Sequence, residues 1–380
     1  MAVLRVLAFV AGAAVVVATF GSAIRTVILP RGVPARLGRF VFVGMRRLFR
    51  LRAGRSASYE KRDRAMALYA PITLLVLLLV WITLVLIGYT AMFWAFSPES
   101  LRNAFRLSGS SILTVGFERP PDIPSTILAF SEAALGLILL ALLITYLPTI
   151  YAAFSRREAV VTAMEVRAGS PPSGVEMLER YWRLEAFDRL HALWVNWEMW
   201  FVEIEETHTS FPALVFFRSP QPDHSWVTAG GAILDAASLM ASSVDWPREP
   251  AAEFCIRAGY LSFRRVADFF RIEYNPDPAP SDPISITREE YDAAYDRLAA
   301  DGVPMKPDRE QAWRDFAGWR VNYDAVLLSL AALTMAPYAP WSSDRSPAEW
   351  TPSLLQRRGR SRVAPPQHNE GVRGAGGPLA

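Results

Sequence analysis

Cysteine is almost absent from this 380-residue chain, since Cys255 is the single one. One thiol cannot form an internal disulfide, and no zinc-type spacing of cysteine and histidine includes it. A Gly-rich phosphate loop after a strand is also missing, because the glycines of 374–377 lie in a Pro- and Gly-rich tail. No arrangement of serine, cysteine and histidine is typical of a nucleophile. We therefore expect no enzyme activity and no cofactor.

Three long stretches of the chain contain no charged residue or only one. Residues 6–24 and 69–96 contain no charged side chain, and residues 123–154 contain only Glu132. A helix needs about 20 apolar residues to cross a bilayer, so the sequence predicts three transmembrane helices. For the first, residues 1–30, a secretory signal is the alternative. A retained span is favoured, because the run is longer than a signal core and arginines follow it.

Basic residues are concentrated between the first two spans. Residues 31–64 hold eleven Lys or Arg side chains and only two acids, Glu60 and Asp63. Such a loop is typical of the cytoplasmic side. Because it adjoins a span, we interpret it as a membrane-surface segment and expect no nucleic-acid partner. The pattern predicts a multi-pass protein of the plasma (inner) membrane, with the amino terminus and residues 97–122 outside and everything after Arg156 inside.

The outer connection does not resemble an ordinary polar loop. Residues 97–99 are typical of a helix start, and Leu101, Phe105 and Leu107 give that helix an apolar side. Residues 112–117 follow as an extended apolar strip. A short helix with an extended return predicts a re-entrant loop over residues 98–120.

The order of span, short helix, Thr-Val-Gly-Phe strip and span over residues 65–155 resembles the pore module of potassium channels. The resemblance implies that Thr114, Val115, Gly116 and Phe117 form an ion-pathway filter of backbone carbonyls, with the Thr114 hydroxyl at the innermost site. It also implies a homotetramer, because one chain supplies only two pore-forming spans, and potassium as the permeant ion.

The outer end of the strip departs from that family. Glu118 and Arg119 stand where a second glycine and an aspartate are usual, and with Asp122 they would form the outer mouth. A bulky residue in the left-handed conformation costs about 1–2 kcal/mol, so the sequence predicts an outer filter of different shape. Whether the pore selects potassium strictly is left open.

The third span carries three further candidate residues. By resemblance, Gly136 is a hinge, although helix packing explains a glycine equally well. Pro148 is expected to kink the helix. Glu132 lies one turn before Gly136 and either pairs behind the filter, faces a cavity, or stays wet near the outer interface.

The second half of the chain predicts an all-helical cytoplasmic domain over residues 175–341, joined to the third span by a helix extension and linker, 156–174. The only strand signal in this half is the short run 213–217. The apolar run 325–337 is too short to be a fourth transmembrane helix. The tail, 342–380, is expected to be disordered and to approach membrane lipid. Helical patterns cover residues 175–208, 226–242, 250–272, 286–301 and 307–336.

Only one polar cluster in this half suggests a metal. Glu205 and His208 are weak candidate ligands, and a solvated helix end is the favoured interpretation because their spacing matches no metal motif. No motif identifies a regulatory ligand or protein partner.

Two functions therefore compete. The first is a tetrameric, potassium-like cation channel with an altered outer filter. The second is a non-conducting membrane sensor or scaffold that keeps a channel-like module and works through its helical domain.

The charge asymmetry makes a topology prediction. Ser100→Cys should react with an impermeant thiol reagent added outside intact cells, and Ser170→Cys should react only after permeabilisation. Labelling of position 170 from outside would reverse the orientation.

Overall fold

The computed structural model describes residues 2–28, 36–53, 63–64, 66–96 and 100–346. This part of the chain consists of helices joined by turns and irregular loops, with one isolated bridge between Val244 and Met305. The α-helices and 3-10 helices (η) are α1 (Ala2–Val27), α2 (Arg36–Ala53), α4 (Tyr69–Phe96), α5 (Leu101–Ile112), α6 (Ile123–Ala168), α7 (Gly174–Arg183), η1 (Phe187–Arg189), α8 (Leu190–Ser210), η2 (Pro212–Phe216), α9 (Trp226–Ser242), α10 (Pro250–Phe270), α11 (Arg288–Ala300), α12 (Arg309–Arg320), α13 (Asp324–Thr334) and η3 (Ser343–Arg345).

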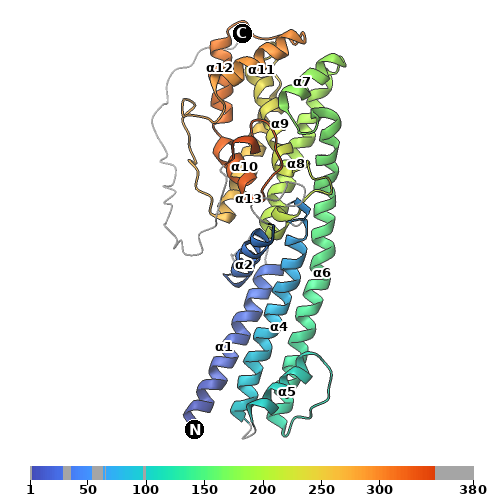
Figure 1. Ribbon diagram of the computed structural model, residues 1–380, viewed down its shortest axis with the longest axis vertical. Coiled ribbons are helices and arrows are strands. Elements are labelled where there is room, and N and C mark those ends of the chain that lie inside the picture. Colours follow the sequence, from blue (N-terminus) through green and yellow to red (C-terminus); the bar gives the residue numbers. More distant parts are fainter. Residues whose placement is uncertain (1, 29–35, 54–62, 65, 97–99, 347–380) are drawn as a thin grey trace, which may run out of the picture.

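Three helices, α1, α4 and α6, are long and apolar enough to cross a membrane, as the uncharged stretches predict. This indicates a membrane protein. They run side by side at one end of the molecule, and α5 lies at their far end (Figure 1). We call α1, α4, α5 and the first part of α6 the apolar bundle.

Two glycines let α1 and α4 approach closely. A Cβ on Gly12 would lie 2.4 Å from the Gly88 carbonyl oxygen, and one on Gly88 would lie 2.7 Å from the Val16 side chain. Small residues at such a crossing allow backbone contact that larger side chains prevent. The first apolar stretch is therefore packed specifically against the second.

Helix α6 continues well beyond the apolar bundle. It ends at Gly169, whose φ of 80° is readily adopted only by glycine. Its last turns carry Val161, Met164 and Ala168, which are buried in the core of the following helices. The last turns of α6 are therefore part of that core, and residues 169–173 form the turn to α7.

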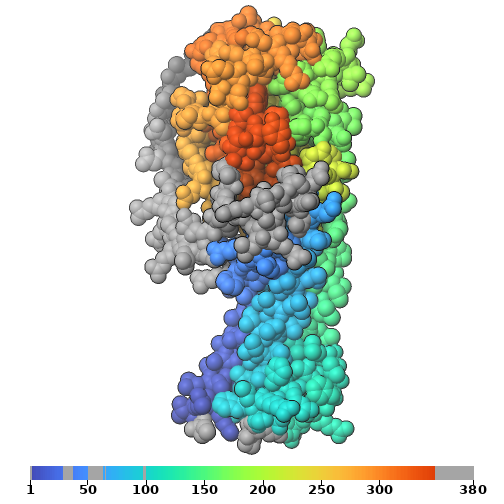
Figure 2. Space-filling view, viewed as in Figure 1, coloured from blue at the N-terminus to red at the C-terminus, as the bar shows by residue number. Residues whose placement is uncertain are grey.

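The remaining helices, α7 to α13, pack with the end of α6 into what we call the C-terminal body. Figure 2 shows it at the opposite end of the molecule from α5. Its central helix is α9, which is buried on nearly all sides and contacts α7, α8, α10, α12 and α13. Trp194 and Phe201 of α8 are fully buried in this core.

Several boundaries differ from the sequence prediction. The 175–208 pattern is two helices, because the chain turns at Glu185 with a φ of 51°. The 307–336 pattern is also two helices, separated at residues 321–323, where Tyr323 turns inward and bonds to Asp235. The weak strand signal at 213–217 corresponds to the 3-10 helix η2 and its cap, in agreement with the all-helical prediction.

The predicted tail begins too early. Ser342 is buried, and Arg345 forms an ion pair with Glu290 at 2.8 Å, so residues 342–346 belong to the C-terminal body. The rest of the predicted tail, 347–380, lies outside the described residues, as do parts of the 31–64 loop. Within that loop the sequence analysis did not foresee the helix α2.

Because α6 supplies part of its core, the C-terminal body should not fold alone from residue 175. Residues 155–346 should unfold cooperatively on heating, whereas residues 175–346 should melt at a clearly lower temperature or not cooperatively. Losing a buried methionine such as Met164 costs about 2–5 kcal/mol by itself. Circular dichroism melting of both fragments checks this, and equal stability would contradict it.

Candidate functional site

The candidate site is built on α5, the short helix between α4 and α6. It begins at Leu101, and its cap is Ser100, whose hydroxyl accepts from the Asn103 amide at 3.4 Å. The expected start at 97–99 lies outside the described residues. One side of α5 is buried against the other helices of the apolar bundle through Ala104, Leu107 and Ile112. The last turn of α5 is therefore fixed against α6.

Glu132 of α6 holds α5 from behind. Its carboxyl is fully buried and accepts from the Ser108 hydroxyl at 2.5 Å. The same hydroxyl lies 3.1 Å from the Leu86 carbonyl oxygen of α4. A polar group buried among apolar helices is stabilised by such a partner. Of the three alternatives for Glu132, the structure has it paired behind the strip.

Gly136 is the point of closest contact between α6 and the end of α5. A Cβ there would lie 2.6 Å from the Ile112 carbonyl oxygen. Packing therefore explains this glycine. Pro148 lies inside α6, more than three turns further along.

The strip that follows α5 is fixed by Ser110. The Ser110 carbonyl oxygen accepts from the amides of Val115 at 3.0 Å and Gly116 at 3.2 Å. Its hydroxyl accepts from the Glu118 amide at 3.1 Å. Among the described residues, none donates a hydrogen bond to the carbonyl oxygens of residues 114–117. The strip amides therefore point back to α5, while the carbonyl oxygens of 114–117 accept no hydrogen bond from a described residue.

The strip is strained as well as exposed. Thr114 has a φ of 56° and Gly116 of 73°. A β-branched residue in the left-handed region is a genuine outlier, and such strain is typical of functional sites. Val115 is 62 % and Phe117 57 % exposed. Apolar side chains with this much exposed surface in one chain are available for contact with other chains.

The residues expected to form the outer mouth are arranged as follows. Glu118 is not among the described residues with positive φ, so it does not adopt the left-handed conformation of a second filter glycine. It pairs with Arg106 of α5 at 2.6 Å, and that guanidinium lies 5.9 Å from the centre of the Phe117 ring. Arg119 is exposed and has no ion pair with a described residue.

Asp122 serves α6. Its carboxylate accepts from the Ser125 amide at 2.8 Å and caps the helix. Glu118 and Asp122 thus have separate partners, and neither neutralises Arg119.

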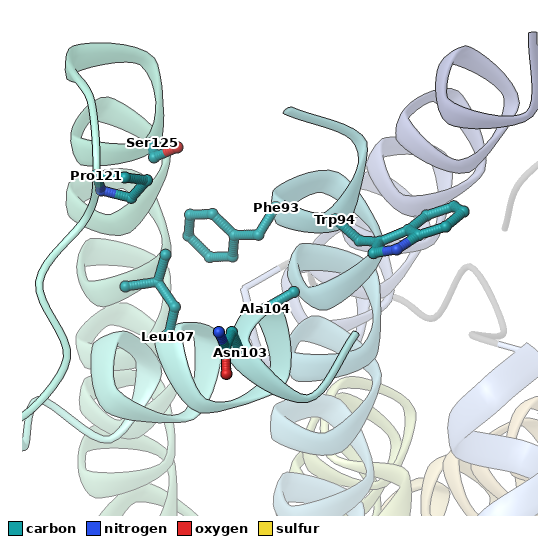
Figure 3. Close-up of a pocket in the computed structure, with 7 residues that line it drawn as sticks. All are labelled: Phe93, Trp94, Asn103, Ala104, Leu107, Pro121 and Ser125. Carbon is teal, nitrogen blue, oxygen red and sulfur yellow. The ribbon is translucent and has the colours of Figure 1, made fainter. Parts of the chain in front are cut away.

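A shallow hollow lies behind α5, next to α4 and the start of α6 (Figure 3). Its interior has room for about one water molecule, so an organic ligand would not fit. Its lining residues are Phe93, Trp94, Asn103, Ala104, Leu107, Pro121 and Ser125.

A second polar cluster lies where α6 enters the C-terminal body. Arg157 is buried, donates to the carbonyl oxygens of Leu214 at 2.9 Å and Phe217 at 2.7 Å, and pairs with Glu158 at 2.7 Å. Its Nη1 also lies 3.1 Å from His208 Nε2. A buried guanidinium with this many acceptors ties α6 to η2.

This cluster explains His208 without a metal. Since a guanidinium only donates, Nε2 accepts and the proton sits on Nδ1, 3.0 Å from the Ile204 carbonyl oxygen. Burial, with the Arg157 charge second, holds the pKa of His208 well below its usual range. Glu205 instead pairs with Arg265. Within the described residues no cluster of three or more ligand-type side chains could hold a metal, and the two weak candidates do not share a site.

Sequence reasoning identified the strip but missed the residues that hold it. Arg106, Ser108 and Ser110 recur on α5 at spacings of two, and only the fold shows that they bond to Glu118, Glu132 and the strip amides. No match was found among protein-family models, curated proteins or solved structures.

The contact between α5 and α6 makes a stability prediction. Gly136→Ala should destabilise the full chain by about 1–3 kcal/mol, because its Cβ meets the Ile112 backbone. The matched control is Gly109→Ala on α5, whose Cβ would have its nearest neighbour, Leu86, at 3.9 Å. That change should be neutral or stabilising, since alanine is the better helix former. Thermal unfolding of the purified protein measures both, and equal effects would contradict the packing role.

Proposed function

We propose that this chain is the pore-forming subunit of a tetrameric, potassium-like cation channel. The observation that carries the proposal is the pairing pattern of the strip. Its amides at Val115, Gly116 and Glu118 bond to Ser110, while the carbonyl oxygens of 114–117 accept from no described residue. A filter that replaces the hydration shell of an ion needs carbonyl oxygens that are available in this way.

Assembly of four chains is part of the proposal. Each chain contributes one strip to the ion pathway, and a closed pore of the potassium-channel type needs four such strips. The exposure of Leu113, Val115 and Phe117 supports it, because apolar side chains next to a strained strip favour burial by neighbouring copies.

The proposed orientation follows from charge. The strip and α5 lie on the outer side, and the C-terminal body lies in the cytoplasm, because the arginine-rich segment before α4 favours the inside. The residues 98–120 then re-enter the membrane, surrounded by α4, α6 and neighbouring copies. Potassium is the expected permeant ion at the inner sites, which Thr114 and Val115 would form.

A specific observation favours the alternative function. Arg119 is exposed and not paired with Glu118, which binds Arg106 instead. Four such arginines around one mouth would repel entering cations. A non-conducting membrane sensor or scaffold that works through the C-terminal body is the second candidate.

The experiment is ion flux from reconstituted vesicles, with potassium and sodium gradients compared. Wild-type chain should conduct, and Gly116→Ala should abolish the flux while expression and assembly remain nearly unchanged. Its φ of 73° disfavours a side chain, and four Cβ atoms would narrow the pathway. Gly109→Ala on the preceding helix is the control that should keep the flux.

The same assay tests the outer mouth. Glu118→Gly restores the glycine usual in potassium channels and should keep or raise the preference for potassium over sodium. Undiminished flux in Gly116→Ala would reject the filter. A wild-type chain that forms tetramers and yet passes no ion would favour the sensor or scaffold.

A further inference from the structure

Helix α2 combines a strong positive charge with a firmly anchored inner side. Residues 36–53 include six arginines and no acid. Val41 and Val43 are buried, and the Tyr69 hydroxyl of α4 donates to the Phe42 carbonyl oxygen at 2.8 Å. The Phe42 ring also lies 6.2 Å from that of Phe216 in η2. The helix is therefore held in one orientation.

Its outer side is apolar and open. Phe40 is 67 % and Leu48 57 % exposed, and they are separated by two steps of four residues, which places them along one side of the helix. Gly44 lies between them, and a Cβ there would meet nothing within 4 Å. Arg47 is exposed beside them. We call Phe40, Gly44, Arg47 and Leu48 the outer face of α2.

The position of α2 identifies the environment of this face. The helix packs against α1 and α4 and lies where the apolar bundle meets the C-terminal body (Figure 1). This is the level at which helices that cross a membrane leave its hydrocarbon core. Apolar side chains flanked by arginines at that level are typical of helices that lie in the membrane interface.

Positive charge accumulates further on the body side. Burial, with the neighbouring Arg271 guanidinium second, lowers the pKa of Arg39. Arg271 follows α10, so two segments far apart in sequence bring like charges together beside α2.

We propose that the outer face of α2 lies on the membrane and binds anionic phospholipid, with Phe40 and Leu48 reaching the acyl boundary and Arg47 pairing with headgroup phosphate. Charge separates this partner from the other candidate occupants. A second copy of α2 is equally basic, and residues 347–380 hold five arginines against two acids, so both would be repelled. Nucleic acid would leave Phe40 and Leu48 without an apolar partner.

The experiment uses the full chain with Cys255→Ala, reconstituted in phosphatidylcholine alone or mixed equally with phosphatidylglycerol. A nitroxide on Gly44→Cys reports its depth through collisions with oxygen, which enters the bilayer, and with a water-soluble nickel chelate. We expect a lipid-like ratio at position 44. Leu184→Cys, on an exposed residue of the C-terminal body, is the control that should collide mainly with nickel.

A second measurement tests the charge. Spin-labelled phosphatidylglycerol and phosphatidylcholine report the lipid preference of the protein, and Arg47→Gln should lower the preference for the anionic lipid about fivefold at most. Arg314→Gln, an exposed arginine of α12, should leave it unchanged.

Three results would overturn the proposal. Nickel access at position 44 in both membranes would place the outer face in water. Loss of collisions with both reagents would mean that protein covers it, as a second copy or the tail would. An unchanged lipid preference in Arg47→Gln would remove the anionic headgroup from the interaction. None of these readouts uses ion flux, so they are independent of whether the chain conducts.

Discussion

The buried guanidinium of Arg157 is the interaction on which the two halves of the molecule depend. It sits on α6, the only helix that belongs to both the apolar bundle and the C-terminal body among the described residues, and it holds the backbone of η2 through two carbonyl oxygens. Removing one partner of a buried charge typically costs about 3–5 kcal/mol, because the other is left without compensation. The neutral His208 completes the set without adding a second charge.

Through η2 this contact reaches the rest of the fold. The Phe216 ring lies 5.4 Å from that of Tyr69 on α4 and 5.5 Å from that of Phe270 on α10. Aromatic pairs at such distances add about 0.5–1.5 kcal/mol each beyond the area they bury. The five-residue 3-10 helix η2 thus contacts the start of α4, helix α2 and α10 of the C-terminal body. Helix η2 therefore couples α4 to the C-terminal body, whereas α6 enters the body directly.

Local patterns were sufficient for the apolar helices, because hydrophobic length is readable from sequence. The expected extended conformation of 112–117 was wrong, since Ile112 ends α5 and Thr114 and Gly116 have positive φ. Local patterns were insufficient where a residue far away in the sequence determines the local conformation. The run that suggested a strand at 213–217 is held as 3-10 helix by Arg157, which lies more than fifty residues away. Glu118 escapes the left-handed conformation because Arg106 and Ser110 hold it elsewhere. Helix α2 cannot be recognised from its local pattern, because its six arginines are equally typical of a basic loop.

The three hydrogen bonds to Ser110 have a mechanical consequence. Because one residue in the last turn of α5 receives the amides of positions 115, 116 and 118, the strip is attached to that turn as a rigid unit. A rotation of α5 about its axis would swing the carbonyl oxygens together and not one at a time. Because Ser108, two residues earlier, donates to Glu132 of α6, such a rotation would also have to break or strain that hydrogen bond.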